Sequence, residues 1–306
     1  MAQISGYIGR FAPSPTGPLH LGSLTAALAS WVDARAHNGH WLLRIEDIDP
    51  QREQAGAAAH IVQSLQAHAL KWDKPIIYQS ERSSLYEGAL HQLRRNQRLY
   101  ACTCTRKQLR EIALESGNSC YPGLCRDKRL TEGSSALRLT VPPAQRTAFK
   151  DANYGEVSES VGQTTGDFIV RRRGPLYAYQ LAVVVDDAAQ GITHVVRGAD
   201  LLDNTARQIV LQQALGYSEL DYLHVPVITD GAQKLSKQSG AEALDNSTPL
   251  KNLTQAWQCL GQETPGDSHC KSTDAFLAFA VSHWKRDCIG NVSINIQNTK
   301  LVNTNG

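Results

Sequence analysis

The fold is decided by the stretch Arg10-Phe11-Ala12-Pro13-Ser14-Pro15-Thr16-Gly17-Pro18-Leu19-His20-Leu21-Gly22. Its prolines exclude a helix or a central strand, so it predicts a turn between a buried strand at residues 7–13 and a helix at residues 22–36. A strand, a tight turn and a helix start together commonly bind phosphate, because unpaired N–H groups and the helix dipole face the anion. His20 could donate to phosphate there, and Gly22 would let a base or ribose approach closely. Considered alone, His20-Leu21-Gly22 is better explained by an ordinary Pro-rich turn with a surface histidine.

Strands and helices alternate on both sides of a middle segment. After the first helix we expect a strand at residues 40–46, a helix opened by Asp49-Pro50, and a helix at residues 81–96. The alternation resumes with Leu181 to Asp187 and continues through a strand at 194–197, a helix at 204–215 and a strand at 225–228. This order is typical of βαβ units, and it predicts a Rossmann-like α/β fold with a parallel sheet.

The middle segment interrupts this pattern with a cysteine-rich stretch and short strands. We therefore expect an inserted α+β domain within a divided Rossmann-like domain, followed by a short helical C-terminal region. The predicted boundaries are residues 1–98 and 181–240 for the two halves of the Rossmann-like domain, 99–180 for the insertion and 241–306 for the C-terminal region.

Composition restricts the possible classes of function. The net charge is only +2, which gives no general electrostatic case for nucleic acid, so such a partner would need a local basic patch. The N-terminus has neither the basic nor the apolar region of a signal peptide, and no apolar run approaches the ~20 residues of a membrane span. Seven cysteines without even spacing do not form a secreted disulfide framework. We expect a soluble cytoplasmic chain with reduced thiols and no membrane partner.

A second motif, Lys234-Leu235-Ser236-Lys237, follows a predicted strand and the turn Thr229-Asp230-Gly231. Two lysines three residues apart could stabilise charge on a triphosphate in the transition state. Considered alone, the motif fits a solvated basic turn better than a phosphate site.

Together the two motifs resemble the paired signatures of class I aminoacyl-tRNA synthetases. The long first motif is similar to the glutamyl branch of that family, as are Leu43-Arg44-Ile45-Glu46-Asp47-Ile48-Asp49 and Val196-Arg197-Gly198-Ala199-Asp200. The resemblance spans roughly residues 7–240. The lysine motif departs from the commonest form at Leu235 and Gln238 but keeps both lysines.

The resemblance implies a reaction in two steps. The carboxylate of glutamate attacks the α-phosphate of ATP, which Mg²⁺ accompanies, and an RNA hydroxyl then captures the glutamyl adenylate. It assigns His20, Lys234 and Lys237 to catalysis, and His20, Gly22 and Lys237 to ATP binding. The glutamate pocket that it implies is Arg10, Phe11, Ala12, Pro13, Ser14, Glu46, Tyr179 and Arg197.

Within that pocket, arginines suit the two carboxylates of glutamate, because a guanidinium binds a carboxylate with two parallel hydrogen bonds. Glu46 would bind the ammonium group. An alternative for Arg10 and Glu46 is a structural ion pair beside the sheet. Tyr177 lies two residues from Tyr179 and competes with it for the role of pocket tyrosine.

Four cysteines lie close together in the insertion, and their spacing alone indicates a zinc site formed by Cys102, Cys104, Cys120 and Cys125. The family resemblance instead implies Cys102, Cys104, Tyr121 and Cys125, with the tyrosine oxygen as fourth ligand. We favour this second set and leave Cys120 open as a competitor. The zinc would be structural and would stiffen the insertion that meets RNA.

The resemblance narrows further because only residues 238–306 follow the second lysine, too few for a complete anticodon-binding module. The chain resembles the truncated paralogues of the family, the glutamyl-Q tRNA(Asp) synthetases, which attach glutamate to the queuosine base in the anticodon loop of tRNA(Asp). We therefore expect L-glutamate, ATP and the tRNA(Asp) anticodon stem-loop as partners of a monomer. Two alternatives are a compact glutamyl-tRNA synthetase that charges a tRNA 3′ end and a non-catalytic, synthetase-like RNA-binding module; intact His20, Gly22, Lys234 and Lys237 argue against the latter.

Overall fold

A parallel sheet forms the centre of the molecule. The computed structural model describes residues 6–133, 135–230, 233–234 and 242–295. Strands β1 (Ile8–Phe11), β2 (His40–Ile45) and β3 (Ile77–Tyr78) pair in parallel in that order. The short apolar runs of β1 and β2 are buried on both faces, as expected for strands covered by helices.

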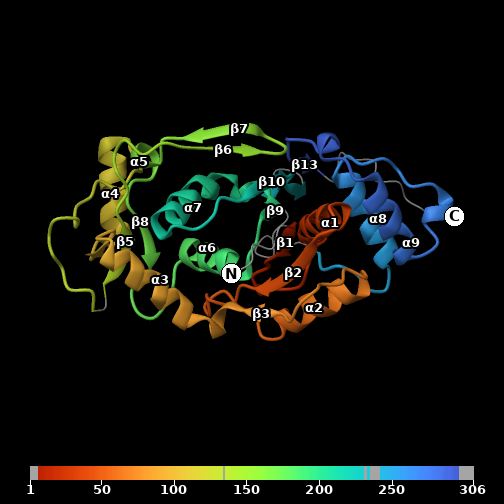
Figure 1. Cartoon of the computed structure of the whole chain (residues 1–306), viewed down its shortest axis with the longest axis horizontal. Helices are drawn as coiled ribbons and strands as arrows, with labels where there is room; N and C mark the ends of the chain where they lie inside the picture. The colour runs from red at the N-terminus through yellow and green to blue at the C-terminus, as the bar shows by residue number, and fades with distance from the viewer. Residues whose placement is uncertain (1–5, 134, 231–232, 235–241, 296–306) are drawn as a thin grey trace.

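A second group of strands adjoins the first. Strands β9 (His194–Gly198) and β10 (Asp221–Val225) pair in parallel, and the amide of Thr193 donates to the carbonyl of Ile8 at 2.9 Å, which places them beside β1. The hairpin of β6 (Thr147–Asp151) and β7 (Gly155–Glu159) extends this sheet, since Asp151 pairs with Tyr222 of β10. In Figure 1 the hairpin runs along the upper edge toward β10.

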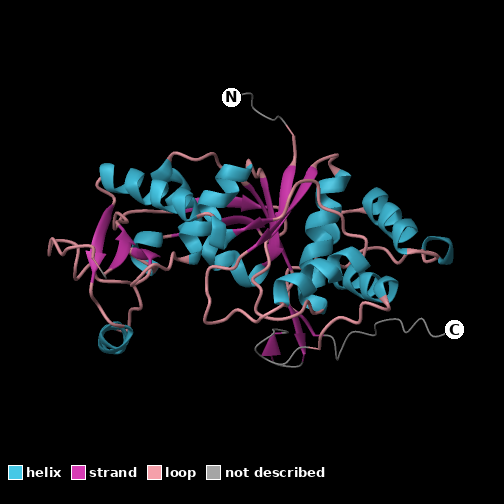
Figure 2. Ribbon diagram, turned by 90° about the horizontal axis from the view of Figure 1, so that it is seen from below, coloured by secondary structure: helices cyan, strands magenta, loops and turns pink. Residues whose placement is uncertain are grey.

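Helices lie on both sides of the central strands (Figure 2). They are α1 (Leu21–Ala36), α2 (Ala57–Ala67), α3 (Ser83–Arg95), α6 (Tyr179–Gln190) and α7 (Leu202–Leu215). The apolar positions of α1 recur at helical spacing, and Leu24, Leu28 and Val32 are fully buried in the main core. This packing fixes the start of α1 next to the carboxyl end of β1.

A separate antiparallel sheet lies at one end of the molecule (Figure 1). It consists of β4 (Leu99–Cys102), β5 (Ala136–Leu139) and β8 (Phe168–Arg171), with β5 in the middle. Helices α4 (Arg106–Ser116) and α5 (Val161–Thr164) accompany it. The short strands expected in the middle segment are therefore confirmed at residues 136–139 and 168–170.

The C-terminal part packs on α1 through helices α8 (Pro249–Cys259) and α9 (Thr273–His283). Trp257 and Phe276 are fully buried there and meet edge to face. A small sheet of β11 (Ile228–Asp230), β12 (Gln233–Lys234) and β13 (Ile294–Asn295) lies beside them. Within the described residues, no helix is long and apolar enough to cross a bilayer.

Two local predictions were wrong. Asp49 does not cap a helix, because turns at residues 50–52 and 55–56 follow it and α2 begins only after Gly56, whose φ of 78° is left-handed. The carboxylate of Asp49 instead binds Arg52 and Arg172. The strand expected at 225–228 is divided, because β10 ends at Val225 and β11 begins at Ile228. Pro226 lies between them and has no N–H for a sheet.

Candidate active site

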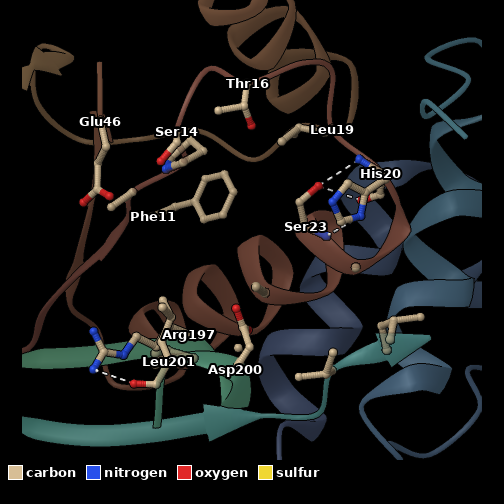
Figure 3. Close-up of a pocket in the computed structure, with 18 of the residues that line it drawn as sticks. Phe11, Ser14, Thr16, Leu19, His20, Ser23, Glu46, Arg197, Asp200 and Leu201 are labelled. Atoms are coloured by element: carbon tan, nitrogen blue, oxygen red, sulfur yellow. Dashed lines mark hydrogen bonds between the residues drawn. The ribbon is translucent and has the colours of Figure 1, made fainter. Parts of the chain in front are cut away.

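The main pocket opens where the parallel strands end. It is a cavity of about 560 Å³ next to the carboxyl ends of β1, β2, β9 and β10, the usual location of ligands in open α/β sheets. Most of the residues expected to bind glutamate or ATP line this cavity. They are Arg10, Phe11, Ala12, Pro13, Ser14, His20, Gly22, Glu46, Tyr179 and Arg197. In Figure 3, Glu46 and Arg197 lie on one side of the view and His20 on the other.

A buried ionic cluster lies behind Arg10 and Glu46, two residues that line this pocket. Arg10 Nε donates to Asp187 Oδ1 at 3.1 Å, and Arg44 Nη1 donates to the same oxygen at 2.8 Å. Arg44 Nη2 also reaches Glu46 at 3.4 Å. Burial alone would raise the pKa of Asp187, but the guanidinium groups of Arg10 and Arg44 hold it below its ordinary value. Arg10 thus does form an ion pair, though with Asp187 of α6 and not with Glu46.

Glu46 differs electrostatically from Asp187. Burial raises the pKa of its carboxyl group, and the charges of Arg44 and Arg10 only partly counteract that effect. Its side chain lies in the wall of the pocket, so a cationic group of a ligand could supply the compensation that the protein does not.

Arg197 is held by several acceptors. Its Nε donates to His224 Nε2 at 3.1 Å, and Nη1 donates to Gln208 at 2.8 Å. Nη2 donates to the Thr205 hydroxyl, also at 2.8 Å. Because β10 and α7 provide these acceptors, the guanidinium has one fixed orientation at the wall of the pocket.

The two competing tyrosines have different surroundings. Tyr179 begins α6 and lines the main pocket, where burial raises the pKa of its phenol. Tyr177 points toward α3, and its hydroxyl donates to Glu87 at 3.0 Å. Of the two, it is Tyr179 that shares the main cavity with Arg10 and Arg197.

His20 caps α1 at the opposite side of the pocket. Its Nδ1 accepts the backbone N–H of Ser23 at 3.3 Å, while the Ser23 hydroxyl accepts the backbone N–H of His20 at 2.8 Å. This reciprocal capping fixes the imidazole ring, and in the neutral ring the proton is then on Nε2. A Cβ at Gly22 would lie 3.2 Å from the ring, so the glycine makes room for His20 itself.

The lysine motif is described only at its start. The backbone of Lys234 forms β12, where it pairs with Thr229 of β11, and Ile228 of β11 lines the pocket. Leu235, Ser236 and Lys237 lie outside the described residues.

Three of the four clustered cysteines converge in the insertion. The sulfur atoms of Cys102, Cys104 and Cys125 lie within 4.8 Å of one another. The hydroxyl of Tyr121 lies 3.4 Å from Cys102 Sγ and 3.6 Å from Cys104 Sγ. The thiol of Cys120 faces elsewhere, toward the carbonyls of Tyr121 and Gly162. Three thiols and a phenol are a donor set that fits Zn²⁺.

Sequence reasoning missed the residues that support the pocket: Asp187, His224, Asp151, Thr205 and Gln208. Arg44 lies in the motif that contains Glu46, but the resemblance assigns it no role. The signal for Asp187 was available, because two acidic residues end an apolar run at Val183–Asp187, and such buried acids require partners. No comparable local pattern marks His224 or Asp151.

Comparison with known proteins places this geometry in a family. The model of the catalytic domain of "tRNA synthetases class I (E and Q)" matches residues 8–252, and the chain therefore belongs to this family of ligases. A glutamate-tRNA synthetase from Elizabethkingia anophelis has a similar fold, with a TM-score of 0.79 at 24% identity over 95% of this chain and 68% of that one. The expected Rossmann-like class I fold is thus confirmed.

More similar sequences come from one branch of the family. Glutamyl-Q tRNA(Asp) synthetase of Pseudomonas fluorescens is 49% identical over 92% of each chain. The protein of the same name from Vibrio parahaemolyticus is 46% identical over 91% of this chain and 92% of its own. The resemblance to this branch, inferred from the motifs together with the short segment after the second lysine, is confirmed at the level of sequence.

Proposed function

We propose that this chain activates glutamate with ATP and transfers it to the queuosine base in the anticodon loop of tRNA(Asp). The observation that carries the proposal is the cavity shared by Arg10, Glu46, Tyr179 and Arg197 with the helix start at His20. The names of the relatives at 46–49% identity support the RNA substrate.

Glutamate fits the charges of this cavity. Among the described residues, Nη1 of Arg10 makes no hydrogen bond, so it has donors left for a carboxylate. Arg197 provides the second guanidinium, and the buried carboxylate of Glu46 suits the ammonium group of the substrate. Phe11, Ala12, Pro13 and Ser14 form the adjoining wall.

ATP would bind at the start of α1. Nε2–H of His20 and the N–H groups of the helix start are donors for phosphate oxygens. In the reaction, a carboxylate oxygen of glutamate bonds to the α-phosphorus, the bond to pyrophosphate breaks, and pyrophosphate leaves with the electron pair. Mg²⁺ bound to ATP would offset the negative charge of the phosphates. Lys234 and Lys237 would stabilise the leaving group, as the motif predicts.

Zinc would be held by Cys102, Cys104, Cys125 and Tyr121. The ion would supply a structural crosslink between the end of β4 and the loop that follows α4. The contacts of the Cys120 thiol with backbone carbonyls support a ligand set without this cysteine. The stiffened insertion would contact the anticodon stem-loop, with the chain acting as a monomer.

The deciding experiment uses labelled glutamate with purified tRNA(Asp), with and without queuosine, beside tRNA(Glu). We expect label only on tRNA(Asp) that carries queuosine. Label on tRNA(Glu) alone would replace the proposal with a compact enzyme that charges a 3′ end. Glutamate-dependent exchange between ATP and pyrophosphate without RNA tests the first step separately.

The glutamate pocket is tested by Arg10→Ala. We expect glutamate activation to fall by at least about 100-fold, because a guanidinium–carboxylate contact contributes roughly 3 kcal/mol or more, while the KM for ATP changes little. Arg35→Ala is the matched control, since it removes another Arg–Asp ion pair, with Asp73, away from the pocket. Unchanged glutamate kinetics in Arg10→Ala would show that the pocket is misassigned.

The metal ligands are tested by comparing Tyr121→Phe with Cys120→Ser. We expect the purified Tyr121→Phe chain to hold zinc more weakly in competition with a chelator, and Cys120→Ser to match the parent. Loss of zinc in the cysteine variant alone would favour the set of four cysteines.

A further inference from the structure

Behind Arg197 lies a buried chain of hydrogen bonds that the proposed reaction does not use. Arg197 Nε donates to His224 Nε2 at 3.1 Å, and His224 Nδ1 lies 2.6 Å from Asp151 Oδ2. The side chains of His224 and Asp151 are completely buried. These hydrogen bonds thus connect the wall of the pocket, through His224 of β10, to Asp151 at the end of β6.

The chemistry of the three groups determines where the protons are. A guanidinium only donates, so Nε2 of His224 must accept, and the ring proton must be on Nδ1, where it is donated to Asp151. If the His224 ring were doubly protonated, its Nε2–H would point at Nε–H of Arg197. Two donors would then face each other without an acceptor between them. The direction of its pKa shift agrees with a neutral ring. Burial lowers the pKa of His224 and the positive charge of Arg197 lowers it further, whereas the hydrogen bond to Asp151 raises it.

The orientation of Asp151 is fixed as well. Its Oδ1 accepts the backbone N–H groups of Asn153 and Tyr154, both at 3.0 Å, in the turn of the β6–β7 hairpin. Its Oδ2 is therefore directed at His224. Burial would raise the pKa of this carboxyl, but the hydrogen bond from His224 keeps it below its ordinary value.

We propose that Asp151 and His224 are positioning residues that hold Arg197 in the orientation needed to bind a carboxylate of the amino-acid substrate. The proposal rests on the proposed function for the identity of that ligand. It also gives the β6–β7 hairpin a role, because the hairpin joins the sheet at Asp151 (Figure 1) and thereby connects the insertion to the glutamate pocket.

Asp151→Asn tests this arrangement with a minimal change in shape. The amide oxygen would stay with the two backbone N–H groups, so the amide nitrogen would face His224 Nδ1 as a donor. The ring proton would then move to Nε2, where its N–H would oppose Nε–H of Arg197 and would face the Thr205 hydroxyl, which lies 3.3 Å from Nε2 and already accepts from Nη2 of Arg197. Asp151→Asn should therefore disturb Arg197 through the tautomer, even when the fold is intact.

The experiment combines imidazole ¹⁵N NMR with glutamate-dependent ATP–pyrophosphate exchange on the full chain. In the parent we expect a neutral His224 with its proton on Nδ1, assigned by the loss of its signal in His224→Gln. In Asp151→Asn we expect the proton on Nε2 and a KM for glutamate raised roughly 10- to 100-fold, the loss typical of a hydrogen bond to a charged group. The KM for ATP should stay within about twofold, since uniform damage to the fold would affect both substrates.

Two further variants separate positioning from simple packing. His224→Gln keeps an oxygen that can accept from Arg197, so it should retain more glutamate affinity than His224→Leu. Asp221→Asn is the matched control, because Asp221 pairs with His194 at 3.3 Å across the same two strands but at their other ends, where Asp221 is exposed. It should leave both KM values unchanged.

The proposal is overturned if parental His224 is charged or carries its proton on Nε2 at pH 7.5. It is equally overturned if the tautomer changes in Asp151→Asn while the KM for glutamate does not. Absence of glutamate-dependent exchange in a parent chain with the expected tautomer would instead refute the proposed function, so the two failures are distinguishable.

Discussion

At the scale of single residues, two buried acids at the pocket have pKa values shifted in opposite directions. Asp187 meets two guanidinium groups, which keep its pKa low, whereas among the described residues Glu46 has a single guanidinium contact, with Arg44 at 3.4 Å, and burial keeps its pKa raised. Asp187 therefore stabilises the pocket arginines, and Glu46 is left with unsatisfied negative charge. Such a carboxylate attracts the ammonium group of a ligand, because the ligand supplies the missing positive charge. When the pocket is empty, the same carboxylate destabilises the folded chain.

We predict that Glu46→Gln binds glutamate poorly but is at least as stable as the parent at neutral pH. The folded chain holds the proton of Glu46 more tightly than the unfolded chain, because its pKa is raised. Its contribution to stability therefore falls as the pH rises through the interval between the unfolded and folded pKa values. The neutral amide of the variant has no such penalty. Urea unfolding at pH 7 and glutamate KM values measure the two effects.

The control for this substitution is Glu156→Gln, on the exposed face of β7. It should change neither the free energy of unfolding nor the KM for glutamate. A clear loss of stability in Glu46→Gln would mean that the carboxylate is needed by Arg44 more than by a ligand.

At the scale of elements, the start of α1 combines helix capping with ligand binding. We predict that Gly22→Ala preserves or slightly raises stability, because alanine is favoured in helices over glycine by about 1 kcal/mol. Its Cβ would nevertheless lie 3.2 Å from the His20 ring, which must then shift. The KM for ATP in pyrophosphate exchange should rise several-fold, and thermal unfolding should show an intact fold.

Gly88→Ala is the control, because Gly88 lies within α3 and a Cβ there meets nothing within 4 Å. This variant should gain stability without any change in the KM for ATP. Equal kinetics in the two variants would show that the position of His20 does not matter for ATP.

The sequence predicted elements with local signals and failed where distant contacts decide. Local apolar runs and the Pro-rich turn before α1 were sufficient to predict β1, α1 and β2. The start of α2 was missed because Arg172, more than 120 residues away, binds the carboxylate expected to cap it. The pocket followed the same rule, since Arg10 and Glu46 were found in motifs, whereas His224 and Asp151 carry no local signal and are brought there by the packing of β10 and β6.

At the scale of the whole molecule, one buried carboxylate joins the C-terminal part to the first strand. Asp33 of α1 accepts hydrogen bonds from Tyr7, from Trp284 at 2.8 Å and from Arg286 at 2.7 Å. Tyr7 precedes β1, while Trp284 and Arg286 follow α9. The C-terminal part is therefore held by both apolar packing and a paired charge.

We predict that Asp33→Asn lowers the free energy of unfolding by about 2–4 kcal/mol at pH 7, because it leaves Arg286 without its charged partner and weakens two further hydrogen bonds. Burial would raise the pKa of Asp33, but hydrogen bonds from Arg286 and Tyr7 hold it below its ordinary value. Its stabilising contribution is therefore present above the unfolded pKa and is lost as the pH falls through the folded one. The difference in free energy of unfolding between parent and variant, measured with urea, should become smaller in strong acid.

The control is Asp221→Asn, which removes an exposed carboxylate. Its free energy of unfolding should stay within about 1 kcal/mol of the parent value. If both variants lost the same stability, Asp33 would not be the residue that joins these parts of the chain.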